Sequence, residues 1–179
     1  MQKLLTLLIV ALATLLAGCA ASVQRPGGAD AALKVSPAAT RRVALYVQPS
    51  PASMQKSADW ELFRTEWRSA MAAAAGAAGK PFTYYDVEPS GATEPATLIV
   101  VTINDYRYIS PGARYGLGIL TGNAYIDADA RFYELPQRQQ VGARKYATTS
   151  TAWQGVFSAM TEKQVQAITT EMIKELDAR

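Results

Sequence analysis

The feature that most limits the fold of this chain is the run Thr97 to Ile103, TLIVVTI, which is apolar on both faces of an extended strand. A strand of this kind is typical of the interior of a sheet that a helix covers on at least one side. The pattern continues to Ile109, but polar and aromatic residues alternate after Ile103. We therefore expect a central strand whose second half extends beyond the core towards solvent.

Four further segments have the pattern of strands, because they are rich in β-branched and aromatic residues or alternate regularly between apolar and polar residues. Asn123 to Leu135 shows the clearest alternation, with small or apolar residues on one face and Tyr, Asp and Arg on the other. The other three are Arg42 to Val47, Phe82 to Val87 and Val141 to Trp153.

Two segments place apolar residues at spacings of three and four, as on one face of a helix. The first helix is expected to begin at Ser57 and end at Gly76 or Gly79, and the second opens with the capping-box pattern of Thr161 to Gln164. The expected buried positions are Trp60, Phe63, Trp67, Met71, Ala74, Val165, Ile168, Met172 and Leu176. The order β-α-β-β-β-β-α predicts an α+β domain, with two helices on one face of a mostly antiparallel sheet of about five strands.

The first 18 residues have the layout of a secretory signal peptide, with Lys3 before an apolar run from Leu4 to Leu16. The run falls well short of the ~20 residues that cross a bilayer, so we expect no permanent membrane helix. Small residues then lead to the single cysteine of the chain. The stretch Leu16-Ala17-Gly18-Cys19 resembles the lipobox of bacterial lipoproteins.

This resemblance implies that the thiol of Cys19 receives a diacylglycerol, that residues 1–18 are removed, and that the new amino group is acylated, with palmitate among the expected acyl groups. In that family an aspartate after the cysteine favours retention in the inner membrane. Ala20 therefore implies transfer to the outer membrane, with the domain facing the periplasm. The alternative is an ordinary signal peptide cut nearby, which would leave a soluble protein with one free thiol.

The segment after Cys19 is rich in Ala, Ser, Gln, Pro and Gly and has little hydrophobic periodicity. It predicts a flexible tether over residues 19–39, long enough for the domain to stand off the membrane, with a short strand at Leu33 to Val35 as the alternative. Residues 40–179 are expected to form a single domain, large enough to bury a core without disulfides.

The composition leaves little catalytic chemistry. The chain contains no histidine, which excludes Ser-His-Asp and Cys-His arrangements and the usual zinc sites, and its cysteine is expected to be acylated. We expect no metal and no cofactor. The net charge of +3 argues against a nucleic-acid-binding protein, which would carry a clustered basic face. The expected function is a non-enzymatic binding or scaffolding module of the cell envelope.

One enzymatic alternative remains, a carboxylate-dependent hydrolase of cell-wall glycan. Asp127 and Asp129 fall on the same face of one expected strand, about 7 Å apart, which suits an inverting glycosidase. The competing interpretation is an exposed face on which these aspartates pair with Arg131, Arg144 or Lys145 across a hairpin.

The segment from Ser110 to Gly122 has the glycines and proline of a loop but also carries large apolar residues. We treat it as a candidate partner-binding loop, with the bilayer, an envelope protein or peptidoglycan as the partner. Its candidate residues are Arg114, Tyr115, Leu117, Ile119 and Leu120. A further alternative is that the chain is a subunit of an oligomeric outer-membrane pore; the sequence leaves the oligomeric state open.

The layout as a whole, from Cys19 through an early strand and helix to a hairpin and a terminal helix, resembles uncharacterised envelope lipoproteins. More remotely it is similar to the curli-secretion lipoprotein and the penicillin-binding-protein activators. This resemblance concerns the fold and implies no specific function.

Overall fold

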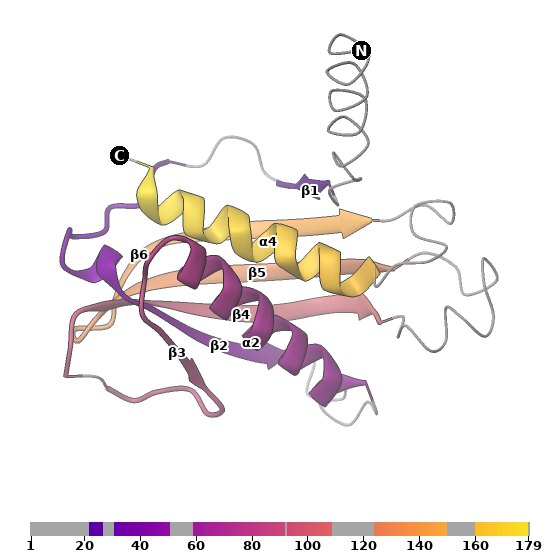
Figure 1. Ribbon diagram of the computed structural model, residues 1–179, viewed down its shortest axis with the longest axis horizontal. Helices are drawn as coiled ribbons and strands as arrows, with labels where there is room; N and C mark the ends of the chain where they lie inside the picture. Colours follow the sequence, from indigo (N-terminus) through magenta and orange to yellow (C-terminus); the bar gives the residue numbers. More distant parts are fainter. Residues whose placement is uncertain are drawn as a thin grey trace, which may run out of the picture.

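The computed structural model describes residues 22–26, 31–50, 59–91, 93–108, 124–149 and 160–178. One sheet of six strands carries two long helices on one face (Figure 1). The strands are β1 (Val23–Gln24), β2 (Val43–Pro49), β3 (Phe82–Tyr85), β4 (Ala96–Arg107), β5 (Tyr125–Leu135) and β6 (Gln139–Thr149). The helices are α2 (Trp60–Ala77) and α4 (Met160–Asp177), with a short 3-10 turn, η1, at Ala39–Arg41.

β4 lies inside the sheet, as the sequence predicts. It pairs with β2 on one side and β5 on the other, in the order β1-β6-β5-β4-β2-β3. Leu98, Ile99 and Val101 on this strand are fully buried. A bulge interrupts the register with β5 between Ile103 and Asp105, and beyond it the side chains are partly or fully exposed. The expectation that the second half of the strand extends beyond the core holds for Asp105 and Arg107, which are exposed, but Tyr106 and Tyr108 pack against the core beside Phe63.

The α+β class is confirmed, but the expectation of about five mostly antiparallel strands is wrong in detail. β2 pairs in parallel with both β3 and β4, while the β4–β5, β5–β6 and β1–β6 pairs are antiparallel. The parallel pairs arise because α2 carries the chain back to the starting end of β2 before β3 begins. The connection from β3 to β4 returns the chain to that end a second time. The sixth strand, β1, comes from the segment predicted to be a tether.

Both helices bury the side chains that their spacing predicts, except that Ala74 is only partly buried and its neighbour Ala75 is fully buried instead. Trp60, Phe63, Trp67 and Met71 of α2 are almost completely buried against the sheet, and the predicted apolar positions of α4 are buried as well. α2 ends as expected, because Gly79 adopts φ of +67° and the Lys80 N–H donates to the Ala75 carbonyl. None of the described helices is long and apolar enough to cross a membrane.

The expected capping box of the last helix is not formed as predicted. The helix already begins at Met160, and the side-chain amide of Gln164 donates to the Ala124 carbonyl at 3.0 Å, just before β5. Gln164 is fully buried. It therefore ties α4 to the sheet instead of closing the first turn of its own helix. Ser57, the expected start of the first helix, lies outside the described residues.

The described parts of the predicted tether lie against the domain. Val23 and Gln24 form β1, and Leu33 and Val35 pack against the main core without forming a strand. The N–H of Ser36 donates to the carboxylate of Glu134 at 3.1 Å. The described contacts therefore pass from the edge of β6, at β1, to Glu134 at the end of β5, before the chain enters the sheet at β2.

Candidate functional site

Several predicted site residues fall outside the described part of the chain. These are Cys19 and the loop residues Arg114, Tyr115, Leu117, Ile119 and Leu120. The structure does describe Asp127 and Asp129, and it also describes both strands that flank the predicted loop. The candidate site is therefore built from the end and edge of the sheet to which these segments connect.

A polar cluster, buried except for the exposed Arg25, fastens the N-terminal segment to the domain. It consists of Arg25, Arg144, Tyr146 and Glu175, and we call it the N-terminal clasp. The carboxylate of Glu175, near the end of α4, accepts hydrogen bonds from Arg25 Nη2 and from the Tyr146 hydroxyl, the latter at 2.9 Å. Its second oxygen accepts from Arg144 Nε. One carboxylate thus joins α4, β6 and the residue that follows β1.

The inner part of the clasp is well shielded from water, with the Arg144 and Glu175 side chains only 6% and 9% exposed, whereas the Arg25 side chain is 36% exposed. A buried carboxylate is costly unless it is paired and hydrogen-bonded. Arg144 also donates to the Ala143 carbonyl at 2.8 Å and to the Ala31 carbonyl at 2.6 Å, so its guanidinium holds the backbone of the N-terminal segment as well.

The tyrosine of the clasp acts as a hydrogen-bond donor. Burial raises the pKa of the Tyr146 hydroxyl, and the negative charge of Glu175 raises it further. The hydroxyl therefore keeps its proton at physiological pH and can donate to the Glu175 carboxylate. The Arg25 guanidinium lies over the Tyr146 ring, 6.0 Å from its centroid. A cation at this distance adds a modest attraction to the ring.

The clasp corrects one expectation for Arg144. That residue was expected on the exposed face beside Asp127 and Asp129, but the alternation of β6 places it with Tyr146 on the helix-covered face. Lys145, next along the strand, lies on the opposite face, with its Nζ 3.7 Å from Asp129 Oδ1. The sequence carries no signal for the clasp, because its members are scattered over residues 25 to 175 and β1 is too short for a periodic pattern.

Asp127 and Asp129 lie on the face of the sheet opposite the helices, in a polar row. The Asn104 amide donates to both carboxylates, at 3.3 Å to Asp127 and 3.1 Å to Asp129. Catalysis by a carboxylate pair requires one member in an apolar setting to act as the acid. Here an amide bridges the two side chains and Lys145 adds a positive charge, so the arrangement favours a surface polar network.

Beside this row, a groove of about 410 Å³ runs between β5 and β6 and reaches the N-terminal segment at Pro26. Its charged lining includes Asp129, Arg131 and Lys145. Within the part of the chain that the structure describes, no three histidine, cysteine, aspartate or glutamate residues are grouped to hold a metal ion.

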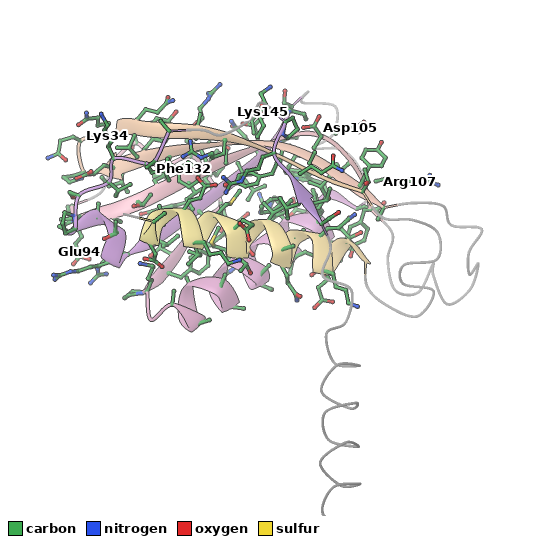
Figure 2. The ribbon with its side chains drawn as sticks, turned by 90° about the horizontal axis from the view of Figure 1, so that it is seen from above. Lys34, Glu94, Asp105, Arg107, Phe132 and Lys145 are labelled. Atoms are coloured by element: carbon green, nitrogen blue, oxygen red, sulfur yellow. The ribbon has the colours of Figure 1, made fainter. Side chains whose placement is uncertain are left out.

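The end of β4, the start of β5 and the end of β6 meet at one end of the sheet, and β1 lies beside them. Arg107 at the end of β4 pairs with Tyr125 at the start of β5, and Tyr125 pairs with Thr149 at the end of β6. Val23 of β1 pairs with Thr148 at this same end. We call it the anchor end, because the expected lipid-attachment residue, Cys19, comes only four residues before Val23 in the sequence. Figure 2 places Asp105 and Arg107 here, and Lys34 and Glu94 at the opposite end.

Comparison with known proteins gives a fold relationship only. No family model matches the chain, and no curated protein matches it significantly in sequence. Among solved structures, the PelC dodecamer from Paraburkholderia phytofirmans is similar, with a TM-score of 0.52 and 8% identity over 88% of this chain and 98% of that chain.

A single-site variant of that dodecamer has a TM-score of 0.48 and 11% identity, again over 88% of this chain and 98% of that chain. Protein XCC0632 from Xanthomonas campestris, of the DUF330 family, has a TM-score of 0.45 and 12% identity, over 80% of this chain and 89% of that chain.

Proposed function

We propose that the protein is a lipid-anchored component of the bacterial cell envelope that works by binding or scaffolding and not by catalysis. The observation that carries this proposal is the sequence Leu16-Ala17-Gly18-Cys19 at the end of an apolar leader. Acyl chains each contribute about 0.8 kcal/mol per buried CH₂, so several chains on one cysteine give a lasting attachment. Ala20 directs the protein to the outer membrane, with the domain in the periplasm.

The arrangement of the described residues is consistent with this role. The polar residues of the N-terminal clasp fasten parts of the chain together, and Asn104, Asp127 and Asp129 form a row on an open sheet face. Such a face, with a groove beside it, offers area for contact with an envelope protein or with peptidoglycan.

Metabolic labelling with a radioactive or alkyne-bearing fatty acid tests the anchor. We expect label on the wild-type protein and none on Cys19→Ala, because Cys19 is the only cysteine. The variant should accumulate with its leader uncut or leave the membrane fraction. Label on the variant, or a wild type without label, would refute the anchor.

We also propose that copies of the chain assemble with one another. The specific support is the similarity in fold to a protein that was crystallised as a dodecamer. A homo-oligomer would present the binding surface many times at one membrane, which raises its effective affinity for an extended partner.

A further inference from the structure

The position of β1 limits how far the domain can move from a lipid on Cys19. Only Ala20, Ala21 and Ser22 separate that cysteine from Val23, the first residue of the sheet. Four residue steps span at most about 14 Å when fully extended, whereas a free tether of about 20 residues would reach about 70 Å. The anchor therefore lies close to the point where β1 begins.

The direction of β1 determines which part of the domain lies nearest to the anchor. β1 is antiparallel to β6, and Val23 pairs with Thr148, one residue before β6 ends. Ser22, which precedes Val23, therefore lies level with the end of β6, on the side away from the body of the sheet. Figure 1 shows β1 beside the tip of the β6 arrow, at the end where the β4 and β5 strands also begin or finish.

The side chains at the anchor end are suited to a lipid headgroup layer. Tyr108 and Tyr125 are partly exposed there, and Arg107 and Asp105 are exposed, so the surface carries charges of both signs. Tyrosine is enriched where proteins meet the membrane interface, because its ring is apolar and its hydroxyl is polar. Tyr125 donates to Asp105 at 3.1 Å, and the Tyr108 ring packs 6.2 Å from the Phe63 ring, so both are held in place.

The clasp keeps the N-terminal segment from detaching from the domain. Cys19 therefore stays near the anchor end. β1 alone has two residues and would be a weak attachment. Arg25, directly after it, is bound to Glu175, and Arg144 holds the Ala31 carbonyl further along the chain. The segment that follows β1 is therefore fixed to both the sheet and α4.

We propose that the anchor end of the sheet, formed by Arg107, Tyr108, Tyr125 and Thr149, rests on the membrane surface, held there by the short connection to Cys19 and by the clasp. The partner of this surface is a layer of phospholipid headgroups. The inference rests on the proposed lipid anchor and adds an orientation to it. The opposite end, with the β5–β6 turn, points away from the membrane.

The two ends of β6 give a matched pair of probes. Thr149 and Gln139 are both exposed and lie about 33 Å apart along one strand. Because acylation consumes the thiol of Cys19, Thr149→Cys or Gln139→Cys supplies the only reactive thiol for a fluorophore. The lipidated variants are reconstituted in phosphatidylethanolamine and phosphatidylglycerol vesicles that contain lipids with spin-labelled headgroups, which quench nearby fluorophores.

We expect the label at Thr149 to be quenched severalfold more than the label at Gln139. A linker of about 20 Gly and Ser residues between Ala21 and Ser22 should remove the difference, because it restores the free tether. Arg25→Ala should reduce it, with thermal unfolding showing that both variants remain folded.

The outcomes separate this inference from the proposal on which it rests. Protein that does not float with the vesicles refutes the anchor and the orientation together. Protein that floats but shows equal quenching at the two ends, or stronger quenching at Gln139, refutes the orientation alone. A difference that survives the linker shows that the short connection does not orient the domain, and this also refutes the inference.

Discussion

Glu175 is a buried carboxylate that depends on donors from two other parts of the chain. Removing the Tyr146 hydroxyl with Tyr146→Phe takes away one donor while keeping the ring. Because hydrogen bonds to charged groups contribute about 1.5–3 kcal/mol, we expect the free energy of unfolding to fall by about 2 kcal/mol. Denaturant titration measures this change.

Tyr133→Phe is the matched control, since Tyr133 packs on the open face of the sheet, away from the clasp. Its effect should stay within about 0.5 kcal/mol, as for most substitutions outside a buried network. If the two variants lose the same stability, the hydroxyl of Tyr146 is not a specific support for Glu175.

Substitution of Asp127 and Asp129 tests whether the protein is a scaffold or a hydrolase. We expect the purified wild-type protein to release no sugar from isolated peptidoglycan, and Asp127→Asn and Asp129→Asn to behave identically. Each change should alter stability by less than about 1 kcal/mol, because the pairs involved are partly exposed. Sugar release by the wild type that either variant abolishes would instead establish the enzymatic alternative.

For single residues, the sequence predicts which side chains share a face of a strand better than it predicts the groups that they contact. The alternation of β5 places Asp127 and Asp129 together, as expected, and Lys145 beside Asp129. It does not identify Asn104 as the group that bridges them. That contact depends on the register between β4 and β5, which shifts at a bulge and is not encoded in either strand alone.

At the scale of elements, the contact between α2 and α4 brings two carboxylates near each other. Burial raises the pKa of Glu66 on α2, and the charge of Glu162 on α4 raises it further. The folded state therefore holds this proton more tightly than the unfolded chain, whose pKa is about 4.5. The stability from Glu66 is fully present below that value and is lost as pH rises through the folded pKa.

Glu66→Gln removes this titration. We expect the variant to have a higher melting temperature than the wild type near neutral pH, with the advantage shrinking as pH falls through the folded pKa of Glu66 and vanishing below about 4.5. Glu162→Gln should act in the same direction but less strongly, because it removes only the nearby negative charge and leaves Glu66 as buried as before. Thermal unfolding at several pH values tests both variants. A Glu66→Gln protein that is less stable at neutral pH would contradict the argument.

The elements that the sequence predicted are those whose residue pattern is local. α2 and α4 follow from apolar spacing, and β4 follows from a run that is apolar on both faces. Two features were missed. The parallel pairing of β2 with β3 depends on the path of the chain through α2, and β1 exists only because β6 offers it an open edge. Long-range contacts decide both.

At the scale of the whole molecule, the proposed anchor at one end of every protomer would restrict how copies can assemble. All protomers on one membrane must present their anchor ends to the same plane. Dihedral symmetry would turn half of the anchors away from that plane, whereas cyclic symmetry about an axis normal to the membrane keeps them together. An oligomer of more than two copies should therefore be a closed ring with head-to-tail interfaces.

Electron microscopy of the lipidated protein in detergent and in lipid nanodiscs tests this expectation. We expect rings of uniform size whose lipid or detergent lies on one face only, and the measured mass should be a whole-number multiple of one protomer. Protein that lacks its leader and carries Cys19→Ala should form the same ring only at higher concentration, because it has lost the confinement to a surface. A monomer at all concentrations, or particles with lipid on two opposite faces, would contradict the proposed assembly, and the second result would also contradict the orientation of the anchor end.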